Sequence, residues 1–98
     1  MNNFGQKVRE IRGRNGSLLR QVAAYLEVDT ALMSKIENGS RRATKEQVTK
    51  IALFLKADKE ELMKLWLSDK IYAIIDENED NTIAEGAVKY ILKQLKNR

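Results

Sequence analysis

The stretch Leu19–Asn38, LRQVAAYLEVDTALMSKIEN, decides the fold of this chain. Its apolar residues recur at intervals of three and four, which is the period of an α-helix with one buried face. The pattern breaks once, at residues 27–29, so it predicts two short helices joined by a three-residue turn. The residues expected to face a common core are Val22, Ala23, Leu26, Val28, Met33 and Ile36.

The second of these helices has a short and mostly polar outer face. A narrow helix with an unobstructed, mildly basic face fits the major groove of B-form DNA, which is about 12 Å wide. Lysine can donate to guanine O6 or N7, hydroxyls can bond several base edges, and a methyl group can touch thymine. The alternative is that these side chains only solvate an exposed helix. The face consists of Thr30, Ala31, Ser34 and Lys35.

Helical periodicity continues through the rest of the chain, and neither strand-like alternation nor proline interrupts it. We therefore predict an all-α protein. Capping signals mark most helix ends: they are Asn15-Gly16, Ser17, Asp29, Gly39, Thr44 with Gln47, and Asp58 with Glu61. The acidic run 76–81 is expected to be a loop. The expected helices are 3–14, 18–26, 30–38, 44–55, 58–76 and 82–95.

Composition excludes several classes of function. The chain has 98 residues, no cysteine and no histidine, so disulfides, thiolate chemistry, imidazole catalysis and the usual zinc ligands are absent. No apolar run of about 18 residues and no secretory signal is present, which favours a cytoplasmic protein without membrane contact. The glycine spacing does not form a phosphate-binding loop. We expect no enzyme activity, no cofactor and no metal.

Charge is unevenly distributed along the chain. Residues 1–57 hold 11 Lys/Arg and 5 Asp/Glu, a net charge of +6, whereas residues 58–98 hold 7 and 9, a net charge of −2. A basic first half is typical of a surface that faces nucleic acid, although an ordinary solvated surface would have the same balance.

Residues 4–57 resemble the phage-repressor-like (Xre-type) helix-turn-helix DNA-binding domains, in register and without a gap. The matching motifs are FGQKVREIR, VAAYLEV, SKIENG and TKEQVTKIALFL. The resemblance implies a five-helix, lambda-repressor-like domain over residues 1–67. The fifth helix would be extended, and residues 68–98 would form a C-terminal helical extension for dimerisation or partner binding.

The resemblance also implies roles for individual residues. Thr30, Ala31, Ser34 and Lys35 fall where the family contacts bases. An Arg12–Glu37 pair would join the first helix to the end of the third. Two positions depart from the family pattern: Leu19 replaces a glutamine that bonds a phosphate, and Glu27 replaces the glycine of the turn. The residues expected at DNA phosphates are Asn38, Ser40, Arg41, Arg42, Arg20 and Arg14.

One such domain reads only a few base pairs, so family members usually pair about a two-fold axis. The fifth helix carries more apolar surface than one of its sides can bury, which favours a homodimer. The last helix is expected either to join that interface or to fold back on its own chain. The interface residues we predict are Trp66, Leu67, Ile71, Tyr72 and Ile75.

The leading hypothesis is therefore a sequence-specific transcriptional regulator that binds double-stranded DNA as a homodimer. Its DTALMSKIENG motif resembles small regulators encoded beside DNA methyltransferases, which suggests control of a restriction–modification locus. The alternative is an antitoxin-type module whose C-terminal helices bind a protein partner while the first domain autoregulates its operon.

Overall fold

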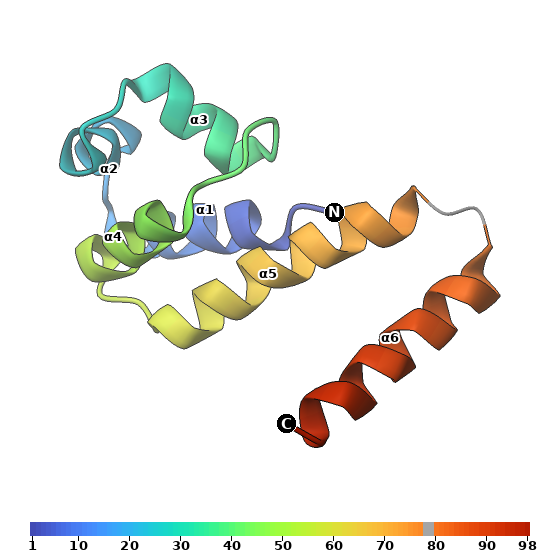
Figure 1. The fold of residues 1–98 in the computed structure, drawn as a ribbon. Helices are drawn as coiled ribbons and strands as arrows, with labels where there is room; N and C mark the ends of the chain where they lie inside the picture. Colours follow the sequence, from blue (N-terminus) through green and yellow to red (C-terminus); the bar gives the residue numbers. More distant parts are fainter. Residues whose placement is uncertain (78–79) are drawn as a thin grey trace.

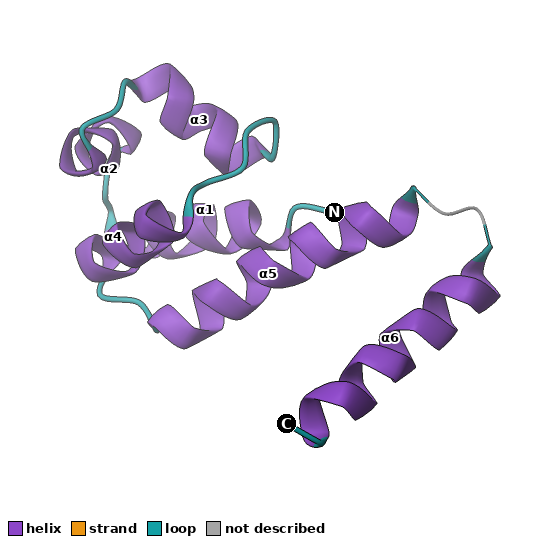
Figure 2. Cartoon of the chain, in the orientation of Figure 1, coloured by secondary structure: helices purple, strands orange, loops and turns teal. Residues whose placement is uncertain are grey.

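The computed structural model describes residues 1–77 and 80–98, and all of the regular structure in these two ranges is helical (Figures 1 and 2). The all-α prediction is confirmed, and every predicted helix end lies within one residue of the observed one. The predicted acidic loop includes Asn78 and Glu79, which lie outside the described residues. The helices are α1 (Asn3–Asn15), α2 (Leu19–Leu26), α3 (Thr30–Asn38), α4 (Lys45–Leu55), α5 (Lys59–Asp76) and α6 (Asn81–Lys96).

Side-chain caps account for the starts of the central helices. Asp29 accepts a hydrogen bond from the Leu32 amide at 2.6 Å, which begins α3. Thr44 and Gln47 exchange the two bonds of a capping box at the start of α4. The prediction for α2 was wrong, since Ser17 is not its cap: Leu18 holds that position, and its amide donates to the Gln21 side chain at 2.7 Å.

The turns after α2 and α3 both need a left-handed residue. Glu27 has φ of 59° and its amide closes the end of α2, although a β-carbon is unfavourable there. Gly39 has φ of 86° and ends α3 as predicted. The three residues between α2 and α3 therefore make the tight corner that fixes the angle of α3.

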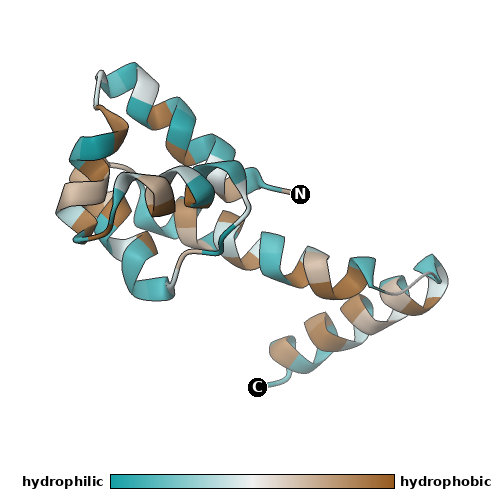
Figure 3. Ribbon diagram, turned by 90° about the horizontal axis from the view of Figure 1, so that it is seen from above, coloured by the Kyte–Doolittle hydropathy of each residue, from teal (hydrophilic) through white to brown (hydrophobic). Residues whose placement is uncertain are grey.

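Helices α1 to α5 enclose one apolar core. Helix α2 packs on α3 and α4, while α1 lies against α3, α4 and α5 (Figure 1). Apolar residues of the first five helices turn inward, which Figure 3 shows as brown faces directed to the centre of this unit. The core residues are Phe4, Val8, Val22, Ala23, Leu26, Met33, Ile36, Ala43, Val48, Ile51, Ala52, Leu55 and Leu62.

Helix α6 is placed differently from the others. It turns back beside α5 but makes no extensive contact with any other described helix (Figures 1 and 3). Ala84 is its one buried residue. None of the described helices combines the length and the apolar character required to cross a lipid bilayer.

Candidate nucleic-acid interface

The outer face of α3 lies on the surface and is free of other segments (Figure 1). Thr30, Ala31 and Lys35 are exposed and Ser34 is half-buried. The opposite face of the same helix supplies Met33 and Ile36, which are almost completely buried in the core. Consequently α3 is held rigidly from behind while its short polar residues face solvent, which is the geometry that major-groove insertion requires.

A buried carboxylate holds the C-terminal end of α3. Glu37 is 2% exposed and accepts two hydrogen bonds from the Arg12 guanidinium, at 2.7 Å from Nε and 3.1 Å from Nη2. The hydrogen bond with Glu37 raises the pKa of Arg12, against the opposing effect of desolvation. Arg9 adds a longer contact to Glu37 at 3.4 Å, and Arg12 also donates to the Ser17 carbonyl. This cluster ties α1 to the last turn of α3.

The N-terminal segment forms a second tie that the sequence did not reveal. The Asn2 side chain donates to the Glu37 carbonyl oxygen at 2.7 Å and accepts from the Gly5 amide. A β-carbon at residue 5 would collide with the same Glu37 oxygen, so the close approach of α1 to α3 requires glycine. Asp69 of α5 accepts from the Asn3 and Phe4 amides at 3.1 and 2.9 Å and so caps α1 from a distant helix.

The loop after α3 folds back on that helix. The Arg41 amide donates to the Lys35 carbonyl oxygen, and the Ser40 amide donates to the Asn38 side chain at 2.8 Å. The Ser40 amide is thus already bonded within this turn. Asn38 and Ser40 shape the loop, and the exposed Arg41 and Arg42 carry its charge.

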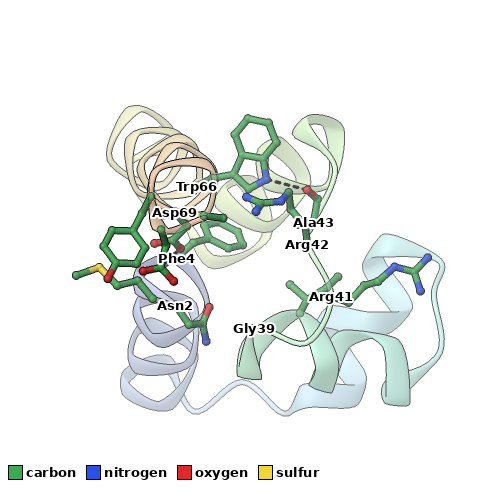
Figure 4. Close-up of a pocket in the computed structure, with 13 residues that line it drawn as sticks. Asn2, Phe4, Gly39, Arg41, Arg42, Ala43, Trp66 and Asp69 are labelled. Atoms are coloured by element: carbon green, nitrogen blue, oxygen red, sulfur yellow. Dashed lines mark hydrogen bonds between the residues drawn. The ribbon is translucent and has the colours of Figure 1, made fainter. Parts of the chain in front are cut away.

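A cavity of about 290 Å³ separates this loop from α5 (Figure 4). Asn2, Trp66 and Asp69 line it on the side of the globule. Arg41 and Arg42 both border the cavity and both are exposed; in Figure 4 the Arg42 side chain is directed toward the side where Trp66 lies, and that of Arg41 points the other way.

The two other arginines expected at phosphates lie apart from this loop. Arg20 is exposed in the first turn of α2. Arg14 lies in the last turn of α1 and forms a 3.8 Å ion pair with Glu10, with both side chains mostly exposed. Among the described contacts, none joins either arginine to α3, and each lies on another helix.

The residues expected at a dimer interface divide into different environments. Trp66 packs against the core of its own chain, and its Nε1 donates to the Ala43 carbonyl oxygen at 2.7 Å (Figure 4). Tyr72 borders the cavity described above. Leu67 and Ile71 are about half exposed, and Ile75 is half-buried beside the start of α6.

Groups of metal-binding side chains would be another kind of candidate site. Within residues 1–77 and 80–98, no three histidine, cysteine or carboxylate side chains gather into a group that could hold a metal ion.

Comparisons with known proteins agree with this geometry. Residues 3–65 match a family described as a helix-turn-helix domain. The chain is also similar to an uncharacterized HTH-type transcriptional regulator, RghRB, of Bacillus subtilis (strain 168), at 41% identity over 64 residues. That alignment covers 64% of this chain and 46% of the relative, so the chain spans about half the length of the curated relative that it matches. No solved structure matches the chain.

The matched region covers more than half of the chain and includes α1 to α4 and the first part of α5. The chain belongs to the phage-repressor-like (Xre-type) helix-turn-helix family.

Proposed function

We propose that this protein is a transcriptional regulator that binds double-stranded DNA sequence-specifically, as a homodimer on a partly palindromic operator. The observation that carries the proposal is the bare outer face of α3, backed by a packed core. Family membership and the name of the Bacillus subtilis relative support the same function.

Within this proposal, base and phosphate contacts come from different residues. Lys35, with Thr30, Ala31 and Ser34, reads base edges, because these side chains lie on the exposed side of α3. Arg41 and Arg42 bind phosphates at the end of the same helix, which fixes the register of the protein without reading sequence. Arg20 and Arg14 extend the phosphate contacts at the edge.

The experiment begins with selection of bound duplexes from a random pool, which defines the operator. Lys35→Ala is then expected to relax the preference at one base pair, at a cost of about 1–3 kcal/mol of discrimination. Lys89→Ala on α6 is the matched control, because Lys89 is an exposed lysine away from α3, and it should leave the preference unchanged.

The double variant Arg41→Ala/Arg42→Ala is expected to weaken binding to all sequences alike. Loss of two phosphate contacts should also reduce the slope of log K against log [salt] by about 2. If this variant changed the sequence preference while Lys35→Ala did not, the assignment of base and phosphate contacts would be reversed.

A more specific form of the proposal concerns the regulated locus. The DTALMSKIENG motif supports control of a restriction–modification system, and a DNA methyltransferase reading frame beside the gene would be the first observation to seek. If no methyltransferase reading frame lies beside the gene, control of a restriction–modification system is ruled out, and the general proposal of a DNA-binding regulator is unchanged.

The second candidate is the antitoxin-type module. The exposed apolar side chains of α6 favour it, since they provide a surface for another protein. Purification from the native host distinguishes the two: a stoichiometric small partner bound through α6 supports the antitoxin, and a partner-free dimer that binds DNA supports the regulator.

A further inference from the structure

Helix α5 is apolar on two opposite sides beyond residue 66. One side, with Tyr72 and Ala73, borders the cavity beside the N-terminal segment. The other carries Leu67, Ile71 and Ile74, which are 48%, 46% and 62% exposed. A helix with apolar residues all round is normally covered all round. No other described segment of this chain covers the second side, so it is an uncovered face of the molecule.

Helix α6 carries an apolar seam that is covered only at its beginning. Ala84, Val88, Ile91 and Leu95 are spaced by four, three and four residues, as in the seam of a coiled coil. The first two are covered and the last two are not: Ala84 is 7% exposed and Val88 is half-buried, whereas Ile91 is 56% and Leu95 50% exposed.

The contact between the two helices is therefore confined to one end. Ile75 of α5 shares a shallow hollow with Ala84 and Val88 of α6. One turn further from the connection, Ile71 on α5 and Ile91 on α6 are both about half exposed. The pair forms a helical hairpin that is closed at its connection and open at its far end.

We infer that a second copy of this chain fills that opening with its own α6. The inference rests on the homodimer proposed above and names the surface that forms it. Each α6 packs between the α5 and α6 helices of the other copy, so that two hairpins interlock about a two-fold axis into a four-helix bundle. The second copy then covers both the exposed face of α5, with Leu67, Ile71 and Ile74, and the distal half of the α6 seam, with Ile91 and Leu95.

Charge favours antiparallel packing of the two α6 helices. The connection between α5 and α6 is acidic at Asp76, Glu77 and Asp80, whereas the end of α6 is basic at Lys93, Lys96 and Arg98. An antiparallel partner brings its basic end to the acidic connection, and a parallel partner would set basic ends against each other.

The size of the surface also fits a second copy. Its exposed apolar residues run from Leu67 to Ile74 on α5 and from Ile91 to Leu95 on α6, so the surface extends along both helices.

Disulfide trapping tests the inference directly, because the chain has no cysteine of its own. The double variant Ile71→Cys/Ile91→Cys is oxidised at micromolar concentration and examined on a non-reducing gel. A covalent dimer that disappears on reduction is expected. A disulfide within one chain would show that α6 closes on its own α5 and would overturn the inference, as would the absence of any disulfide. Ile71→Cys/Lys89→Cys is the matched control and should stay monomeric.

Sedimentation of point variants provides the second test. Ile91→Asp should raise the dimer dissociation constant at least tenfold, while Lys89→Asp, on the same helix, should not change it. Circular dichroism verifies that α1–α5 stay folded in both. If Ile91→Asp remained as dimeric as wild type, the docking would be wrong and the homodimer would stand. A wild-type monomer at about 10 μM would overturn both, whereas DNA binding through α3 is tested separately by Lys35→Ala.

Discussion

At the scale of single residues, the placement of α3 depends on Glu37. Its carboxylate is buried and would be strongly unfavourable there without positively charged partners. Arg12 supplies two short hydrogen bonds from the neighbouring helix, and Arg9 supplies a longer third contact. The backbone carbonyl of Glu37 is held as well, by Asn2. Hydrogen bonds to the carboxylate and to the backbone carbonyl of this one residue therefore hold the last turn of α3 against α1.

Arg12→Ala is expected to lower the free energy of unfolding by about 3 kcal/mol, because the buried Glu37 carboxylate then keeps only its longer contact with Arg9. The retained Arg9 contact keeps the loss at the lower end of the range for broken buried pairs. Urea denaturation measures this. Arg9→Ala serves as the control and should cost less than about 1 kcal/mol, since Arg9 is 59% exposed. Equal losses of unfolding free energy in the two variants would show that Arg9 and Arg12 stabilise the Glu37 carboxylate equally.

Sequence reasoning found some of these residues and missed others for a physical reason. Arg12 and Glu37 follow from the family resemblance, and the α3 face follows from helical periodicity. Asn2 and Asp69 are single polar residues without a periodic signal, and Asp69 meets the start of α1 from 66 positions away. Such a contact depends on tertiary packing, so no local pattern predicts it.

At the scale of elements, local patterns predicted most helix ends but not every contact between distant segments. Caps such as Asp29 and Thr44 act within three residues, so the sequence contains the whole interaction. Trp66 shows the opposite case. We predicted it at a dimer interface because the fifth helix carries surplus apolar surface. That prediction contains no sign of the hydrogen bond from its indole to the Ala43 carbonyl, which lies 23 positions earlier in an irregular loop. Only the fold brings the two together.

The turn between α2 and α3 provides a prediction for one element. A non-glycine residue in the left-handed region costs about 1–2 kcal/mol of stability, and Glu27→Gly removes this cost. Glycine in turn loses more backbone entropy on folding, which costs about 0.5–1 kcal/mol. The variant should therefore be more stable than wild type by about 0.5–1 kcal/mol in thermal or urea unfolding. Ala24→Gly, at an exposed interior position of α2, is the control and should be destabilised by about 1 kcal/mol. Destabilisation by Glu27→Gly would mean that its side chain contributes to the turn.

At the scale of the whole molecule, the chain consists of a packed five-helix unit and a sixth helix with little contact to it. The five-helix unit includes α3, so one copy already contains all of the surface that we propose to read DNA. Helix α6 and the distal part of α5 leave their apolar residues exposed. If a second copy covers them, the distance between two α3 helices becomes a property of the dimer and not of either chain.

The fixed distance between the two α3 helices of a dimer predicts how DNA binding depends on the spacing of the operator half-sites. Two-fold related α3 helices reach half-sites about 34 Å apart, on the same side of the duplex. Inserting about 5 base pairs between the half-sites turns one of them to the opposite side, so only one α3 can bind. Electrophoretic mobility shifts should then show affinity reduced by about 10²-fold or more, because the second contact is no longer intramolecular. An isolated half-site is the control and should bind as weakly as the expanded operator. Equal affinity for the native and expanded operators would mean that each chain binds DNA independently, whatever its oligomeric state in solution.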